Sequence, residues 1–582
     1  ARGRGVWRRR CRRRRGSRWL TRRVPPAVTM TRDDVEVTMS RIDWDSNAPS
    51  PRSDLGNHLE LSLRSDGACE GVTHEASPMK AHTRRHTLLV EEPQSLPAMP
   101  LERLRRAPDW AVVANNIAFM AVPRSIPANF AATGWVIGSL ALVYSSVVTY
   151  DTGLVIGQLC ESSGATSFPE LAVEAIGRWS ARHGWSTARR ELGCRLAHGL
   201  TLSMQFATYY LAEVCELIYF EQYFGQIFGA SPLCQWQWLL IGALIALPVL
   251  QVPAFHEGRW VALLLGLLPL TFNVLVFLYE VALVRPWACT PGPTFSGGAA
   301  EGPQSGRVFL GLTAFAYAFG GHGAYPEEWR EMKSPSSWPR VLRLTYAVTL
   351  PLYFACGMLG YAAYGDFAKA NINVNFPDNL ANQASIAVQM VQEVYFLLST
   401  NLVIMLALEL RLGLDPAACC SPRWNGCPWL GRLPLYPWVG RLVLRSALLG
   451  SQVLVAQLLL AGEGDTIFAL QSLIGAVGMT AFTYFLPYIF LLAMAADLEP
   501  PVAPLSPRRR AWCYASIVVG LAVMIGGARS SLEDLISSSA GLFAGECRLE
   551  YAYSPTSPDD PCYAAPASTF GNSSSTGGTA LR

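Results

Sequence analysis

Apolar and polar positions divide this chain into a hydrophobic middle and two polar ends. The 582 residues are 51% hydrophobic overall, but residues 1–107 and 533–582 are polar, and the charges between them cluster in short connections. The apolar stretches of the middle reach about 20 residues, the length at which a helix crosses a bilayer core of about 30 Å. The pattern predicts an all-α polytopic membrane protein whose transmembrane domain covers 108–532.

Eleven apolar segments are predicted to span the membrane. Basic residues are concentrated in alternate connections, such as "RWSARHGWSTARREL", "EEWREMKSPSSWPR" and "SPRRRA". Because Lys and Arg in short loops are retained in the cytosol, this side is predicted to be cytosolic. The N-terminus is then cytosolic, and the C-terminal tail lies outside the cell or in an organelle lumen. The predicted spans are 110–131, 136–160, 197–222, 236–254, 259–284, 308–325, 340–364, 384–410, 437–461, 466–494 and 511–530.

The polar N-terminal segment is strongly basic at its start. The stretch "RGRGVWRRRCRRRRGSRWLTRR" has no acidic residue near it until Asp33. We interpret residues 1–107 as a disordered basic cytosolic tail, with an organelle-transit segment or a contact to anionic lipid or nucleic acid as alternatives. No secretory signal is recognised before the first span, so insertion would depend on internal helices. The connection at 161–196 contains "FPELAVEAIGRW", which predicts a short amphipathic helix lying against the bundle.

Cysteines offer two candidate disulfides on the non-cytosolic side. Fourteen Cys follow no metal-ligand spacing, so structural thiols are the default interpretation and no metal site is expected, with a zinc site at Cys419, Cys420 and Cys427 as the lesser alternative. Cys234 and Cys289 lie in neighbouring outer loops, and Cys547 and Cys562 share the C-terminal tail. An oxidising compartment would allow either pair to form a disulfide. Asn572 begins a glycosylation sequon on the same side.

Two of the predicted spans are interrupted. In 110–131, Asn115 and Asn116 precede a break bounded by Pro123 and Pro127, and in 308–325 the run Gly320-Gly321-His322-Gly323 precedes Pro326. Free N–H groups at the start of a half-helix attract a carboxylate, and free C=O groups at the end of one attract an ammonium group or a cation. The breaks are five spans apart, which is the spacing of an inverted five-helix repeat with one added helix. Each break alone is equally well explained as a structural kink.

Several motifs around these breaks resemble the amino acid/auxin permease family. "GLTAFAYAFGGHGAYPEEWREMKSP" is similar to the sixth-helix signature of the family, and "YFACGMLGYAAYGD" to its Y-x-x-x-x-x-x-G-Y-x-x-F-G pattern. "LPVLQVPAFHEGRW" resembles the inner loop between helices four and five of plant members, and "LIGAVGMTAFTYFLPYIF" the tenth-helix pattern. The resemblance extends over about 108 to 495. It implies a LeuT-like fold and secondary active transport of amino acids, coupled to protons or sodium.

The resemblance also implies which residues bind substrate. The G-x-G-x-L-x-L-P run of the first helix in the family aligns with Met120 to Pro127, where both glycines are replaced and Arg124 appears. Arg124 either holds a carboxylate or pairs with an acid; if the register is off by a turn, it lies near the outer surface. Because glycine lets a ligand approach the backbone closely, this departure argues against the standard amino-acid pose. The substrate candidates are Asn116, Met120, Ala121, Arg124, Ser125, Tyr209, Phe315, Tyr317, Phe319, Gly320, Gly321 and His322.

Ion coupling has two sets of candidates. Asn116 aligns with a residue similar to a sodium ligand of the neutral amino acid branch, and Ser399 and Thr400 offer hydroxyls; helix–helix contacts are the alternative role of such hydroxyls. A proton needs a group that changes charge, and the buried acids are Asp151, Glu213 and Glu216. Glu213 and Glu216 are three residues apart and share a helix face, although structural hydrogen bonding explains each acid equally well. His322 is a further candidate, or caps carbonyls that the break frees.

The charged exit of the sixth span allows two interpretations. Glu327, Glu328, Arg330, Glu331 and Lys333 form either a solvated charged face, which is the default, or a gate that pairs with Arg105 or Arg106.

Coupled transport of an amino acid or related small zwitterion, bound between spans 1, 3, 6 and 8, is the function that the sequence favours. The alternatives are an amino-acid-sensing receptor that signals through its cytosolic tail and an uncoupled channel, for which no repeated filter motif is present. The chain has no P-loop, zinc-ligand helix or nucleophile elbow, so an enzyme is not expected. The expected partners are an amino acid substrate, a proton or sodium ion and membrane lipid, with no cofactor and no nucleic acid. The expected location is the plasma membrane or a vacuolar or lysosomal membrane.

Overall fold

The computed structural model describes residues 107–120, 123–228, 233–252, 259–284, 304–377, 379–412, 414, 437–460, 466–496 and 505–538. The chain divides into two compact units, Ala1–Arg85 and His86–Arg582, and all described residues belong to the second. Among them every regular element is a helix, and one isolated parallel bridge joins Ala107 to Met332. This confirms the all-α class; the predicted domain boundaries at 107 and 533 stay predictions.

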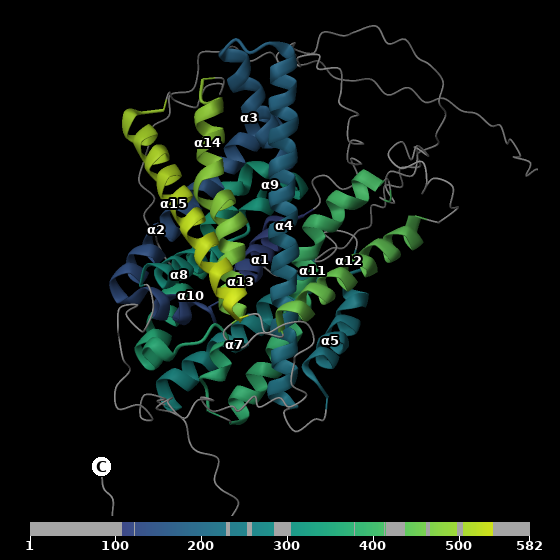
Figure 1. Cartoon of the computed structure of the whole chain (residues 1–582), viewed down its shortest axis with the longest axis vertical. Helices are drawn as coiled ribbons and strands as arrows, with labels where there is room; N and C mark the ends of the chain where they lie inside the picture. Colours follow the sequence, from purple (N-terminus) through teal and green to yellow (C-terminus); the bar gives the residue numbers. More distant parts are fainter. Residues whose placement is uncertain are drawn as a thin grey trace, which may run out of the picture. The chain divides into compact units, whose positions relative to one another are not determined.

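Figure 1 shows how the helices are arranged. In chain order the first half contains α1 (Asp109–Met120), α2 (Ile126–Ser163), α3 (Phe168–Arg182), α4 (Thr187–Ile227), α5 (Gln235–Val249), α6 (Arg259–Val261), η2 (Ala262–Leu267), α7 (Leu268–Tyr279) and η3 (Glu280–Val284). The second half contains α8 (Gln304–Ala318), η5 (His322–Ala324), α9 (Tyr325–Glu331), η6 (Pro335–Ser337), α10 (Trp338–Tyr364), η7 (Gly365–Phe367), η8 (Ile372–Val374), α11 (Leu380–Leu412), α12 (Pro437–Leu460), α13 (Thr466–Ile474), η11 (Gly475–Met479), η12 (Ala481–Phe485), α14 (Leu486–Met494) and α15 (Pro507–Ser538).

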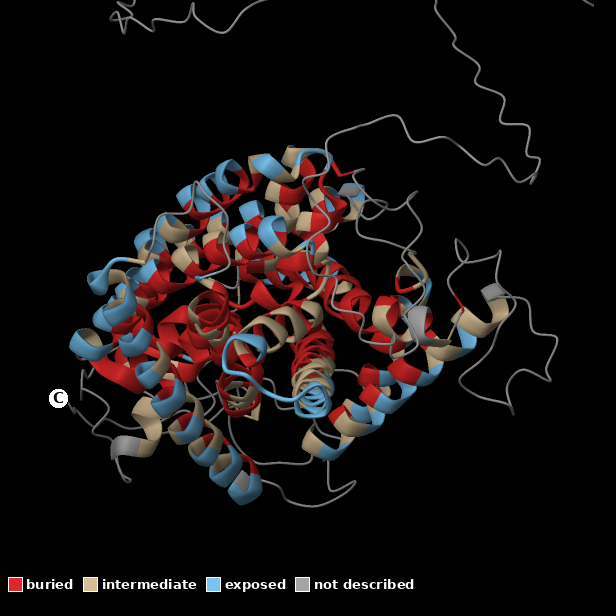
Figure 2. Ribbon diagram, turned by 90° about the horizontal axis from the view of Figure 1, so that it is seen from above, coloured by how far each residue is buried: buried red, intermediate tan, exposed pale blue. Residues whose placement is uncertain are grey.

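Seven helical stretches of the described residues are long and apolar enough to cross a membrane, and Gln235–Val249 is a shorter apolar helix. Several of these helices expose large apolar side chains, including Leu140, Leu244, Leu283 and Ile525. In Figure 2 the exposed positions lie on the outer helices and the buried ones toward the middle. Exposed apolar faces are stable against lipid but not against water. The chain is therefore an integral multi-pass membrane protein. The count of eleven spans stays a prediction, because several expected spans coincide with helices that are broken, short or rich in charge.

Both predicted breaks are present in the structure. The first span is divided between α1, which ends at Met120, and the start of α2, which begins at Ile126. The remainder of α2 is the predicted second span, and the two parts meet at a kink where Gly134 has φ 72°. The sixth span is divided between α8, which ends at Ala318, and η5 with α9. Gly321 lies between them with φ 137°, a conformation that favours glycine.

The helices bury two main hydrophobic clusters. One is built around α2, α8, α10 and α14, and the other around α4, α5, α11, α12 and α13. α8 contributes to both, with Phe315 in the first cluster and Tyr317 in the second. The broken helices therefore lie where the two clusters meet.

The predicted amphipathic connector is α3, which packs against α4 and α14. Its apolar face buries Phe168, Leu171 and Ala175, and the Ser167 side chain caps its first turn. α4 has 41 residues and is about 60 Å long at 1.5 Å per residue, about twice the thickness of a bilayer core. Its N-terminal part is exposed and basic, and it runs beside α3 (Figure 1).

Buried ion pairs join helices that are distant in sequence. Arg445 of α12 is fully buried, donates to Glu409 Oε1 of α11 at 2.6 Å and donates to the carbonyls of Leu250 and Val252 beyond the end of α5. Arg441 also pairs with Glu409, at 3.1 Å. These contacts satisfy carbonyl groups that the end of α5 leaves without helical partners.

We expect Arg445→Ala to lower the free energy of unfolding by about 3–5 kcal/mol. The buried Glu409 then keeps only Arg441 as a positively charged partner, and the carbonyls that follow α5 lose their donor. Thermal unfolding of the purified protein in detergent measures the change. Arg529→Ala is the matched control, because it removes an ion pair with Glu533 whose side chains are 79% and 63% exposed. That variant is expected to unfold like the unmodified protein; equal losses in both variants would contradict the prediction.

Candidate functional site

The two helix breaks lie against each other. The Tyr325 hydroxyl at the start of α9 contacts Met120 Sδ at the end of α1, at 3.5 Å. A Cβ atom placed on Gly321 would lie 3.5 Å from the Phe119 ring. The two breaks, about two hundred residues apart in sequence, are therefore in contact inside the helix bundle.

Side chains of neighbouring helices take up carbonyl groups at these breaks. The Tyr353 hydroxyl of α10 donates to the Ala318 carbonyl at 2.5 Å, and Gln205 Nε2 of α4 donates to the Gly323 carbonyl at 2.7 Å. The Tyr395 hydroxyl of α11 donates to the Asn115 carbonyl at 3.0 Å. Because an unpaired carbonyl is costly in a bilayer, these donors stabilise the interrupted backbone.

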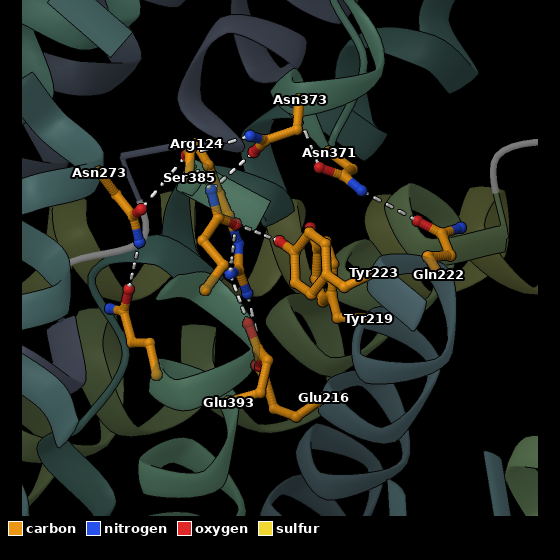
Figure 3. A network of polar contacts seen from close by, with 12 residues as sticks. Arg124, Glu216, Tyr219, Gln222, Tyr223, Asn273, Asn371, Asn373, Ser385 and Glu393 are labelled. Atoms are coloured by element: carbon orange, nitrogen blue, oxygen red, sulfur yellow. Dashed lines mark hydrogen bonds and ion pairs between the residues drawn. The ribbon is translucent and has the colours of Figure 1, made fainter. Parts of the chain in front are cut away.

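Beside the breaks lies a buried charge cluster formed by Arg124, Glu216 and Glu393 (Figure 3). Arg124 Nη1 donates to Glu393 Oε1 at 2.5 Å, and Arg124 Nη2 donates to Glu216 Oε2 at 3.4 Å. The Tyr317 hydroxyl of α8 donates to Glu216 Oε1 at 2.8 Å. The side chains of Arg124, Glu216 and Glu393 are 8%, 4% and 0% exposed. The cluster thus connects the first break, α4, α8 and α11.

Aromatic rings enclose the Arg124 guanidinium. Its central carbon lies 4.1 Å from the centre of the Tyr219 ring, 5.7 Å from that of Tyr223 and 5.9 Å from that of Phe396. A cation over an aromatic face is stabilised by about 2 kcal/mol when desolvated. Arg124 is therefore held by charge, by hydrogen bonds and by cation–π contacts together.

A chain of side-chain amides leads from this cluster to η8. Gln389 Oε1 accepts hydrogen bonds from Arg124 Nη1 at 3.2 Å and from the Tyr223 hydroxyl. Gln389 Nε2 donates to Asn373 Oδ1 at 2.6 Å, and Asn371 Nδ2 donates to Gln222 at 3.3 Å. Figure 3 shows Asn371 and Asn373 near Arg124, with Gln222 bonded to Asn371. Sequence reasoning missed them, although the run "NINVNFPDNLANQ" is visibly rich in Asn.

The family model described as transmembrane amino acid transporter protein matches residues 122–531. The chain belongs to this family. The match confirms the resemblance to amino acid/auxin permeases, and the family is one of transporters and not of enzymes.

Individual relatives of this family member are distant. Amino acid permease 3 of Arabidopsis thaliana is 22% identical over 265 residues, which are 42% of this chain and 52% of the relative. Amino acid transporter AVT1D of Arabidopsis thaliana is 29% identical over 79 residues, which are 12% of this chain and 14% of the relative. The chain thus spans about half the length, or less, of these relatives.

Solved structures are also matched. A manganese transporter mutant from Eremococcus coleocola is 13% identical with a TM-score of 0.43, covering 73% of this chain and 88% of that chain. A sodium-coupled sialic acid symporter is 14% identical with a TM-score of 0.42, covering 76% of this chain and 93% of that chain.

The predicted substrate residues of this transporter-family chain fall into three environments. Arg124 and Tyr317 belong to the charge cluster, and Met120, Gly321 and Tyr209 lie at the contact between the breaks. The others have different surroundings or are not described: Phe315 packs against Phe130, Phe319 packs against Tyr353, Gly320 lies against Met479, Ser125 is the buried N-cap residue of α2, and Ala121 lies outside the described residues.

The predicted sodium ligands have other partners. With the amide oriented to satisfy both groups, Asn116 Nδ2 donates to Glu328 at 2.6 and 3.1 Å. The Thr400 hydroxyl donates to Glu213 Oε2 at 2.5 Å, and the Ser399 hydroxyl donates to the Phe396 carbonyl at 3.2 Å. These contacts do not assemble an oxygen shell shared by Asn116, Ser399 and Thr400.

The predicted proton-coupling groups also differ in their surroundings. Asp151 accepts hydrogen bonds from Arg509 at 2.7 Å and from the Tyr488 hydroxyl at 2.5 Å, so it ties α2 to α14 and α15. His322 Nε2 pairs with the Thr149 carbonyl at 2.7 Å, so His322 caps a carbonyl, although the carbonyl belongs to α2 and not to the break. Glu216 joins the charge cluster together with Glu393.

Three of the five charged residues at the exit of the sixth span are buried, so the default interpretation as a solvated face was wrong for them, whereas Lys333 is exposed. Glu328 and Arg330 are each 7% exposed and Glu331 is 2% exposed. Asn115 Nδ2 donates to Glu328 at 2.7 Å, and Arg330 donates to the Thr166 carbonyl at 3.1 Å. Pairing of the Ala107 and Met332 segments brings the chain before α1 against this exit, which excludes water. Arg105 and Arg106, the expected gate partners, lie outside the described residues.

We expect Gly321→Ala to cost about 1–3 kcal/mol of stability, because alanine is strained at φ 137° although space is available for its Cβ atom. Thermal unfolding in detergent measures the loss. Gly199→Ala in α4 is the control, since no atom outside the helix backbone lies within 4 Å of its added Cβ; it is expected to leave the stability unchanged or slightly raised. A Gly321→Ala variant as stable as this control would contradict the assignment of the strain.

Proposed function

We propose that this chain is a secondary active transporter that moves amino acids or related small zwitterions by alternating access, coupled to a proton or sodium gradient. The observation that carries the proposal is the meeting of two broken helices beside a buried charge cluster. Membership of the transmembrane amino acid transporter family supports the same substrate class. The substrate would bind between α1, the start of α2, α4, α8 and α11.

The proposed site supplies groups for both ends of a zwitterion. The first-turn N–H groups of α2, apart from Pro127, which has none, have no partner within the helix, and they would favour a carboxylate. The carbonyls of Tyr317 and Ala318 at the end of α8 accept hydrogen bonds in the conformation described, so an ammonium group would have to replace one of their donors. Glu216 and Glu393 pair with Arg124 and are not assigned a contact with the substrate. Arg124 is occupied by these acids in the conformation described, so the carboxylate of a substrate would depend mainly on backbone N–H groups.

We further propose that α3 and the start of α4 face the cytosol. The connections with basic residues lie at this end of α4, which favours the cytosol. Cys234, before α5 at the opposite end of α4, is disulfide-bonded, which suits an oxidising exterior or lumen. Its expected partner, Cys289, lies outside the described residues, as do Cys547, Cys562 and Asn572. The plasma membrane or a vacuolar or lysosomal membrane is the proposed location.

Transport by purified protein in proteoliposomes tests the proposed function. We expect saturable uptake of at least one amino acid from a radiolabelled panel of the twenty, accelerated by an imposed proton or sodium gradient, since coupled movement requires a gradient. Protein-free liposomes are the control. Failure of folded protein to take up or exchange any amino acid would refute the substrate class, and uptake that responds to neither gradient would refute coupling.

Thiol labelling tests the orientation. His183 and Lys369 are both exposed. His183 follows α3, which contacts the start of α4 through Val173 and Cys194, whereas Lys369 precedes Ala370, whose carbonyl accepts from Tyr219 near the end of α4. A membrane-impermeant maleimide reaches only the face of the membrane to which it is added. We expect it to modify a chain with His183→Cys only from the cytosolic face and a chain with Lys369→Cys only from the opposite face. The unmodified chain measures the background from native thiols. The reverse pattern would invert the proposed topology.

A further inference from the structure

We propose that Glu216 and Glu393 together bind the single coupling proton of this transporter, with Arg124 as a fixed internal cation. The inference rests on the proposed function and names the coupling ion and its site. It adds Glu393, which no sequence motif indicated, and it excludes Asp151 and the Asn116 oxygen set from this role.

Charge balance is the first argument. The cluster contains two carboxyl groups and one guanidinium group, so with both acids ionised it has one surplus negative charge. The described residues bring no second cation to it. An uncompensated charge in a buried site costs several kcal/mol. One more positive charge is therefore required, and a proton supplies it without needing additional space.

The arrangement of oxygen atoms is the second argument. Glu216 Oε1 accepts from Tyr317 and Oε2 accepts from Arg124, whereas Glu393 Oε2 is buried with no hydrogen-bond partner among the described residues. Both carboxyl groups accept hydrogen bonds from the Arg124 guanidinium, Glu393 at 2.5 Å and Glu216 at 3.4 Å, so they share one buried site. Two carboxylates that share a site repel each other, and a proton on one of them reduces this repulsion.

The residues around Glu216 and Glu393 make a proton the best-fitting ion for this site. The groups that face it are Arg124 from the break, Glu213, Cys215, Tyr219 and Tyr223 from α4, Tyr317 from α8, and Gln389 from α11. The Gln389 oxygen is already occupied by Arg124 and Tyr223. The described residues contain no group of three His, Cys, Asp or Glu able to hold a metal ion. A hydrated or multiply coordinated cation would have to displace Arg124.

Location provides the link to transport. Arg124 belongs to the interrupted segment between α1 and α2, whereas Glu216 and Glu393 belong to the long helices α4 and α11. With both acids ionised, two ion pairs hold the break against these helices. When one of the two acids is protonated, Arg124 has a single negatively charged partner, so the break is held less strongly against α4 and α11. Protonation and movement of the break are thereby coupled.

Two amide variants test the assignment in proteoliposomes. Glu393→Gln and Glu216→Gln each remove a titratable group while keeping its shape. Using the amino acid that the unmodified protein transports fastest, we expect both variants to retain exchange without a gradient. Both should lose accumulation driven by an inward proton gradient, together with the accompanying acidification reported by an internal pH dye.

Matched variants separate this site from its neighbours. Glu280→Gln changes a buried glutamate on η3, outside the cluster, and should keep gradient-driven accumulation. Glu213→Gln changes an acid on the same helix face that pairs with Thr400 and not with Arg124. Loss of proton coupling in Glu213→Gln with normal coupling in both pair variants would overturn the proposal. Accumulation driven by sodium without acidification would also overturn it.

Chemical modification of the unmodified protein provides a measurement that does not depend on variants folding. Dicyclohexylcarbodiimide reacts with protonated carboxyl groups in apolar surroundings. We expect an adduct on Glu216 or Glu393, found by peptide mass spectrometry and suppressed at alkaline pH. Absence of an adduct on both residues would refute the shared proton. Failure of the unmodified protein to exchange any amino acid would refute the proposed function instead, and the adduct could still be read.

Discussion

The absence of water in a bilayer is the constraint on which the rest of this structure depends. Every backbone group released by a helix break and every buried charge must find a partner inside the protein. Tyr353, Gln205 and Tyr395 take up the carbonyls at or beside the breaks, and Glu216 and Glu393 neutralise Arg124. The side-chain donors at the helix breaks and the buried charge cluster are therefore two results of the same requirement.

The same requirement explains why polar residues gather in continuous networks. Gln389 serves Arg124, Tyr223 and Asn373 at once, which connects the buried cluster to η8. At the other end of the bundle, Glu328 accepts from Asn115, and Asn116 is placed to donate to it. A movement of the first break must exchange partners in both networks. This gives the break a small number of discrete arrangements, which suits a protein that alternates between two states.

Periodicity and composition predicted the helices and both breaks because these depend on local sequence. Pro123, Pro127 and the run of glycines at 320–323 disfavour helix wherever they occur, and basic loops mark helix ends. The side-chain partners depend on packing, and there the sequence was less informative. Asp151 was grouped with Glu216 as a buried acid, yet Arg509 reaches it from α15 across more than three hundred residues.

The sequence by itself therefore determined the fold class, the family and the positions of the interrupted helices, since hydrophobic pattern and short motifs are local properties. Only the tertiary structure decided that Arg124 pairs with Glu216 and Glu393 and that Asn116 faces Glu328. It also decided that most of the charged residues at the end of the sixth span are buried. The environment of a charge is set by whichever helices pack around it. Contacts between residues 124, 216 and 393 arise only when three separate segments meet.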